Sequence, residues 1–173
     1  MALIKKVRGI SPVFGENCYL ADNATIIGDV TVGDDCSFWF NTVIRGDVNS
    51  ISIGNKVNIQ DGAVLHCLYR KSVIDIGDNV SVGHNVIIHG AKIHHNVLVG
   101  MGATVMDHVE IGENSIIAAG ALVLKDTKIE PNSIYAGVPA KYVKSVDPEQ
   151  TKDMINRIAD NYLIYADWYR QDS

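Results

Sequence analysis

The hydrophobic positions of this chain repeat at every sixth residue. From residue 91 onward the series runs through Ile93, Val99, Val105, Ile111, Ile117, Val123, Ile129 and Tyr135. A small or β-branched residue lies two positions before each of them. Because residues two apart in a strand face the same side, both point inward and the residue after the aliphatic one points outward. A helical face, which repeats near every 3.6 residues, does not fit this period.

The first half of the chain carries the same pattern with interruptions. Its inward series is Ile27, Val32, Phe38, Ile44, Ile53, Ile59, Leu65, Ile76, Val82 and Ile88. Two steps are longer than six residues, near 47–50 and 67–73, and we interpret both as loops that leave a corner. Short strands joined by corners make triangular coils, and stacked coils bury a continuous core. The pattern therefore predicts a mainly β protein, a parallel β-helix of about six coils.

The period changes after residue 147. Asp147 can cap a helix, Pro148 suits a first helical turn, and Glu149 favours a helix N-terminus. Apolar residues then follow helical spacing at Met154, Ile155, Ile158, Tyr162, Tyr165 and Tyr169. We predict one domain: a hexapeptide-repeat β-helix over 1–147, and a segment 148–173 whose helix, roughly 148–170, packs on it as a brace.

Composition and charge narrow the class of protein. Isoleucine and valine together number 41 against 8 leucines, which favours strands. The net charge of −5 argues against a nucleic-acid partner. No run approaches the roughly 18 apolar residues that span a membrane, and the N-terminus lacks the apolar stretch of a secretory signal. The three cysteines are too scattered for a disulfide framework, so we expect a cytoplasmic protein with reduced thiols.

All six histidines lie between residues 66 and 108. Three inward residues fall on one face of successive coils, which we call face a: Ile44, Leu65 and Ile88. The residues that follow them are Arg45, His66 and His89, and they form an outward column on strands about 4.8 Å apart. Two imidazoles on adjacent rungs can converge on one metal ion. A pair of protein ligands leaves that ion short of donors.

A third histidine, His84, lies at the corner of a different face, which we call face c. It does not easily reach His66 and His89 within one prism, so the count suggests a three-histidine site completed by a neighbouring subunit. Asn58 and Gln60 also point outward from face c. The remaining histidines lack this geometry, and we interpret them as surface or interface residues: His94, His95 and His108. By alternation, the thiol of Cys67 belongs to the core.

Several segments closely resemble the gamma-class carbonic anhydrase-like family of hexapeptide-repeat proteins. They are residues 43–48 (Val-Ile-Arg-Gly-Asp-Val), 58–62, 65–66, 82–85 and 88–90, with a closing segment, 135–141, shared more widely among hexapeptide proteins. The resemblance covers nearly the whole chain and implies a left-handed parallel β-helix. It also implies a homotrimer in which His66 and His89 of one subunit and His84 of its neighbour hold zinc, with Fe²⁺ or Co²⁺ as alternatives.

The same resemblance implies a reaction and further roles. Arg45 and Asp47 match an ion pair that holds the trimer, Gln60 matches a residue that touches metal-bound water, and Asn58 and Tyr135 match pocket residues. Three imidazoles leave one coordination position open for water, whose pKa zinc lowers to about 7. The implied activity is hydration of CO₂ to bicarbonate by zinc-bound hydroxide, with no nucleic acid or membrane as partner.

Two positions depart from the family pattern. Val48 stands where the prototype has a glutamate after its Arg-Gly-Asp, and loop 67–73 has no carboxylate where the prototype carries a shuttle glutamate. The metal ligands are thus complete while the proton path is not. Two other hypotheses stay open: a hexapeptide acyltransferase that uses an acyl-CoA, and a non-catalytic metal-binding or assembly subunit.

Overall fold

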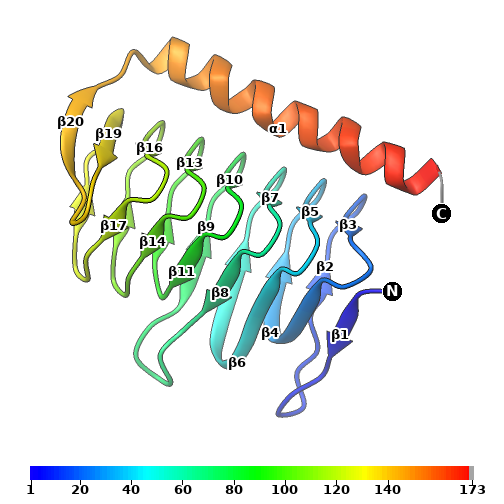
Figure 1. Ribbon diagram of the computed structural model, residues 1–173. Coiled ribbons are helices and arrows are strands. Elements are labelled where there is room, and N and C mark those ends of the chain that lie inside the picture. The colour runs from blue at the N-terminus through cyan, green and yellow to red at the C-terminus, as the bar shows by residue number, and fades with distance from the viewer. Residues whose placement is uncertain (172–173) are drawn as a thin grey trace.

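The repeat folds into a three-sided prism of stacked coils. The computed structural model describes residues 1–171, apart from the side chain of Gln150. Figure 1 shows the coils following one another from β1 to β19, with helix α1 (Pro148–Gln171) lying along one side of the stack. Residues one coil apart therefore lie on neighbouring rungs.

Each side of the prism is a parallel sheet of short strands. Face a contains β1 (Leu3–Lys5), the first halves of β4 (Thr25–Val32) and β6 (Val43–Ile53), then β8 (Val64–His66), β11 (Ile87–His89), β14 (Thr104–Val105) and β17 (Leu122–Val123). Face b contains β2 (Val13–Phe14), the second halves of β4 and β6, then β9 (Ile74–Ile76), β12 (Lys92–Ile93), β15 (Glu110–Ile111) and β18 (Lys128–Ile129). Face c contains β3 (Tyr19–Leu20), β5 (Ser37–Phe38), β7 (Asn58–Ile59), β10 (Ser81–Val82), β13 (Leu98–Val99), β16 (Ile116–Ile117), β19 (Ser133–Ala136) and the antiparallel β20 (Lys141–Ser145).

The prism has about seven coils, one more than the sequence predicted. Face c alone contributes seven parallel strands, from β3 to β19. The additional coil is the first one, at the open end of the prism. Its strand β1 is exposed, with Leu3 at 54% and Ile4 at 51%, so the buried aliphatic periodicity does not mark it.

The core is a set of aliphatic columns that run the length of the prism. On face a the column is in register and fully buried: Ile26, Ile44, Leu65, Ile88 and Val105. The prediction that Ile27 belongs to this column is wrong, because Ile27 pairs with the outward Arg45 and is only partly buried. Residues 26 and 27 are both isoleucine, so the sequence alone does not show which of them points inward. The pairing of β4 with β6 decides it.

The two lengthened steps have different structures. Residues 67–73 form a loop between β8 and β9, as predicted. Residues 47–50 do not form a loop, because β6 continues through them from face a to face b. The extra residues are absorbed by a shift of register against β4, between Gly28 and Val30.

Helix α1 covers face c. It begins where predicted, with the Asp147 carboxylate accepting a hydrogen bond of 3.0 Å from the amide of Glu149. It contacts β5 and β10, and Trp39 packs against Tyr162 and Tyr169 with ring centroids 5.3 and 5.5 Å apart. Residues 172–173 of the predicted 148–173 segment lie outside the described residues. Within residues 1–171, no helix is long and apolar enough to cross a bilayer.

Candidate metal centre

Two histidines stack on neighbouring strands of face a. Arg45 of β6 pairs in register with His66 of β8, and His66 pairs in register with His89 of β11. The imidazole centroids of His66 and His89 are 5.4 Å apart. The predicted outward column is confirmed, because each residue follows a buried aliphatic residue and so faces away from the core.

A carboxylate fixes the first of these histidines. Asp47 Oδ1 lies 3.0 Å from His66 Nε2, and its Oδ2 accepts a hydrogen bond of 2.5 Å from Arg45. Burial alone would raise the pKa of Asp47, but the hydrogen bonds from Arg45 and His66 outweigh it and hold that pKa below its usual value. The aspartate is therefore ionised near neutral pH and holds both members of the column.

A second carboxylate fixes His89. Asp107 Oδ2 lies 2.9 Å from His89 Nδ1, and Asp107 Oδ1 accepts a hydrogen bond of 2.7 Å from the hydroxyl of Ser72. Burial opposes ionisation of this aspartate, yet the hydrogen bonds from Ser72 and His89 lower its pKa below the usual value. Asp107 is 8% exposed, so this charge lies beneath the surface.

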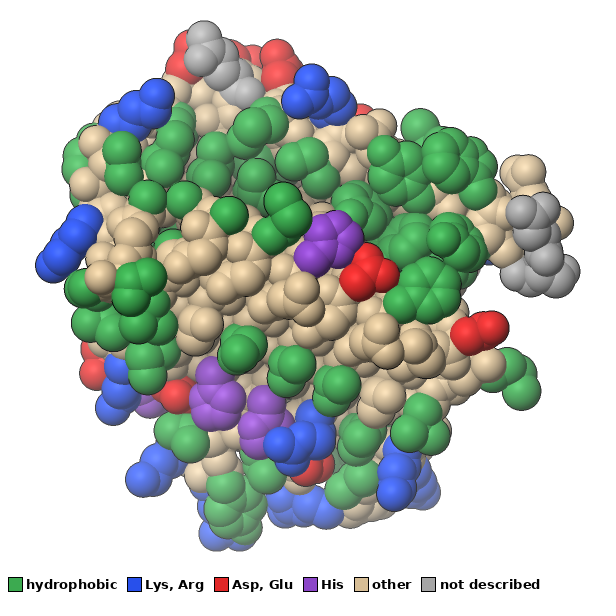
Figure 2. Space-filling view, in the orientation of Figure 1, with side chains coloured by type: hydrophobic (Ala, Val, Ile, Leu, Met, Phe, Trp, Pro, Cys, Tyr) green, Lys and Arg blue, Asp and Glu red, His purple; other side chains and the backbone are tan. Residues whose placement is uncertain are grey.

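His84 is held apart from this pair. It follows β10 at a corner of face c, where its Nδ1 lies 2.9 Å from Asp61 Oδ2. Figure 2 shows one face of the molecule, on which histidine side chains (purple) are exposed among hydrophobic and charged residues. Among residues 1–171, no three His, Cys, Asp or Glu side chains of one chain gather closely enough to hold a metal ion. The chain thus presents His84 and the pair of His66 and His89 on separate surfaces.

The other predicted site residues lie on face c. Asn58 and Gln60 flank the inward Ile59 and are 2% and 6% exposed. Helix α1 covers the strands on either side of them, β5 and β10. Gln60 Nε2 donates to Asn58 Oδ1 at 2.9 Å, and Asn58 Nδ2 donates to Ser81 Oγ at 2.7 Å. Tyr135 lies in β19, three strands beyond β10 in the same sheet, so one chain does not bring it to His84.

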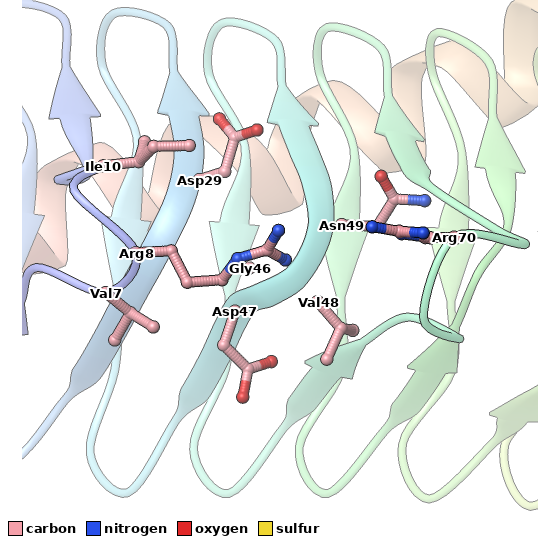
Figure 3. Close-up of a pocket in the computed structure, with 9 residues that line it drawn as sticks. All are labelled: Val7, Arg8, Ile10, Asp29, Gly46, Asp47, Val48, Asn49 and Arg70. Atoms are coloured by element: carbon pink, nitrogen blue, oxygen red, sulfur yellow. The ribbon is translucent and has the colours of Figure 1, made fainter.

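A small pocket lies beside Val48. It has a volume of about 260 Å³, and Figure 3 shows it between the N-terminal segment, β6 and the loop 67–73. Arg8 and Arg70 line it together with the carboxylates of Asp29 and Asp47. Val48 adds an apolar side chain that packs partly against the core. The surroundings of Val48 therefore leave space for a larger side chain and are bordered by two guanidinium groups.

His94, His95 and Cys67 have local partners. His94 pairs with Glu110 at 2.9 Å and His95 with Asp78 at 3.4 Å, both at the surface. Cys67 is buried as predicted, and burial raises the pKa of its thiol to about 11. A thiol that stays protonated near neutral pH belongs to the core rather than to a metal site.

Comparison with known proteins places this geometry in a family. The sequence model of the protein family described as "Bacterial transferase hexapeptide (six repeats)" matches residues 11–46 and 90–125. The chain is 43% identical to the "Carbonic anhydrase" of Geobacillus kaustophilus, covering 97% of this chain and 91% of that protein. It is 49% identical to the "Probable carbonic anhydrase" of Methanocaldococcus jannaschii, covering 89% and 94%.

Solved structures agree with this placement. The crystal structure of a "hexapeptide transferase family protein" from Anaplasma phagocytophilum superposes with a TM-score of 0.90 at 36% identity, covering 96% of this chain and 98% of that one. The fold is the left-handed parallel β-helix with one C-terminal helix. The chain belongs to the gamma-class carbonic anhydrase-like family of hexapeptide-repeat proteins.

Sequence reasoning missed the groups that hold two of the three histidines, His84 and His89. Asp61 and Asp107 pair with His84 and His89, and Ser72 holds Asp107. A signal for Asp107 was present, because Ile88 pairs with Val105 one coil later, which places Asp107 directly after the rung position that neighbours His89. Asp61 and Ser72 are separated from their partners by longer intervals that the loop makes unpredictable.

Proposed function

We propose that the chain forms a homotrimer with a metal centre at each subunit interface and hydrates CO₂ to bicarbonate. His66 and His89 of one subunit and His84 of the next would be the protein ligands. The observation that carries the proposal is the pair His66 and His89, which are in register on neighbouring strands with ring centroids 5.4 Å apart.

The donor set fits zinc. In each of the three histidines one ring nitrogen faces an aspartate, and within residues 1–171 the other ring nitrogen makes no hydrogen bond. Metal-ligating histidines have this arrangement, in which a carboxylate fixes the ring and the opposite nitrogen binds the ion. Fe²⁺ and Co²⁺ accept the same nitrogen donors, so the donor set does not select zinc alone.

Side chains near His84 would orient the reactants. A bound zinc ion would supply a Lewis acid that makes water nucleophilic near neutral pH. The amide of Gln60 is fixed because its Nε2 donates to Asn58, which in turn donates to Ser81. Its oxygen is then free to accept a hydrogen bond from the attacking water, while Asn58 keeps the amide from rotating. Asn58 lies in β7 and Gln60 directly follows it, and β7 pairs with β10, the strand that precedes His84.

Proton removal is the weak step of this active site. Val48 carries no titratable group, and within the loop 67–73 the charged side chains are Arg70 and Lys71, whose ordinary pKa values lie far above 7. We therefore propose that protons leave to buffer in the surrounding water. We also place the protein in the cytoplasm, a reducing compartment that suits its three free cysteines.

Metal content and CO₂ hydration, measured on anaerobically purified protein, test the proposal. We expect three metal ions per trimer, and loss of tight binding in His66→Ala, His84→Ala and His89→Ala, since each variant lacks one of three ligands. His95→Ala is the matched control and should keep its metal. Full metal without hydration, even with added buffer, would support the non-catalytic hypothesis, and acetyl-CoA-dependent transfer by metal-free protein would support the acyltransferase.

A further inference from the structure

The loop 67–73 contains a buried serine that is tied to the start of the loop and to two other segments. Ser72 is 5% exposed. Its hydroxyl accepts a hydrogen bond of 3.0 Å from the amide of Leu68 and donates one of 2.7 Å to Asp107 Oδ1. Its carbonyl oxygen accepts a hydrogen bond of 2.8 Å from the side chain of Asn49. The hydroxyl is therefore held in a single place between the loop and the next coil.

These contacts fix the direction of every proton between Ser72 and His89. The amide of Leu68 can only donate, so the serine proton must point toward Asp107. Asp107 accepts that proton on Oδ1 and faces His89 Nδ1 with Oδ2 at 2.9 Å. An ionised carboxylate can only accept, so Nδ1 of His89 carries the proton and Nε2 keeps its lone pair.

We propose that Ser72 and Asp107 are positioning residues that hold His89 in the Nδ1-protonated tautomer, with Nε2 ready to bind the metal ion. This inference rests on the proposed metal centre. It assigns a role to the loop 67–73, which carries no carboxylate of its own: through Ser72 the loop anchors a histidine on the neighbouring coil.

Gly90 provides the space that this arrangement requires. It follows His89 and has a φ of +66°, a left-handed conformation. A Cβ atom at this position would lie 2.2 Å from Ser72 Oγ and 2.4 Å from Asp107 Oδ1. Any side chain at position 90 would therefore occupy the space where the serine and the aspartate meet.

The test compares two polar substitutions with a buried control. In Asp107→Asn a single amide oxygen replaces two carboxylate oxygens, so it cannot accept from both Ser72 and His89. An amide NH₂ facing Nδ1 would instead select the tautomer that cannot bind metal through Nε2. We expect zinc affinity, measured by competition with a chromogenic chelator, to fall by about 10–100-fold in Asp107→Asn, with a smaller loss in Ser72→Ala.

Two comparisons separate positioning from stability. Ser72→Thr keeps the hydroxyl and should restore affinity relative to Ser72→Ala. Ser115→Ala removes another fully buried, hydrogen-bonded serine two coils further along, and should lower stability without changing zinc affinity. A readout without metal is the ¹⁵N imidazole spectrum of metal-free protein, in which His89 should carry its proton on Nδ1 in the wild type and lose that preference in Asp107→Asn.

The outcomes distinguish this inference from the proposed function. Wild-type affinity in both Asp107→Asn and Ser72→Ala, with His89→Ala still unable to bind zinc, would overturn the inference and leave the metal centre intact. A wild-type protein that binds no zinc would overturn the proposed function. An Nε2-protonated His89 in metal-free wild type would overturn the inference whatever the metal result.

Discussion

Substitution of Gly90 by alanine should lower the free energy of unfolding far more than the same substitution at Gly120. Both glycines are left-handed, with φ of +66° and +67°, so the backbone cost of adding a Cβ is common to both, about 1–2 kcal/mol. At Gly120 nothing lies within 4 Å of the new atom, whereas at Gly90 it would overlap Ser72 Oγ and Asp107 Oδ1. Forcing such an overlap in a packed region adds about 1–3 kcal/mol.

We therefore expect Gly90→Ala to lose about 2–5 kcal/mol of unfolding free energy and Gly120→Ala about 1–2 kcal/mol. The difference between the two variants is about 1–3 kcal/mol. Guanidinium unfolding followed by far-UV circular dichroism measures this difference, at one fixed protomer concentration because the proposed assembly would contribute to stability. Any gain from a stiffer unfolded chain is equal in both variants and cancels. Equal losses at the two positions would show that Ser72 and Asp107 are not packed as described.

Three further predictions follow from the same contacts. Arg45→Ala leaves Asp47 without its 2.5 Å partner, so we expect it to weaken the proposed trimer by about 2 kcal/mol or more. Sedimentation on dilution measures this, and unchanged assembly would exclude an interface role for the pair. The pKa values of Asp47 and Asp107 are lowered in the folded state, so their contribution to stability should be present above pH 4 and lost as the pH falls below it. An Asp107→Asn variant whose stability falls as steeply as that of the wild type between pH 5 and 3 would contradict this. The rate of CO₂ hydration should rise with imidazole concentration. Val48→Glu should replace part of that effect, because the pocket beside Arg8 and Arg70 can accommodate its carboxylate. Fast turnover in weak buffer would show that another residue carries the proton.

The period of six was enough to predict the fold. It predicted the prism and the outward column of Arg45, His66 and His89, because burial alternates with position in each short strand. The helix after Asp147 was predicted from its capping residues and from the change to helical spacing. The period did not predict the structure where two neighbouring residues are equally hydrophobic or where a strand has no buried hydrophobic positions. Ile26 and Ile27 are indistinguishable by side chain, and the exposed first coil carries no buried pattern.

The candidate site was less predictable than the fold. The ligand histidines could be proposed because their spacing places them on adjacent rungs. Asn58 and Gln60 are buried, which the pattern of β7 alone does not reveal, since their sheet lies beneath a helix about 100 residues away in sequence. Ser72 reaches Asp107 through a loop of irregular length, and no periodic pattern predicts such a contact.

The central claim is that each metal centre is shared between two subunits, and mixed trimers test it most directly. His84→Ala and His89→Ala homotrimers should both bind no metal. Trimers that contain both kinds of subunit have one interface at which an intact His66 and His89 face an intact His84. We expect such mixed trimers, purified with two different affinity tags, to bind one metal ion each. Mixed trimers that bind no metal would contradict the shared site, because a centre built within one chain would remain broken in every subunit.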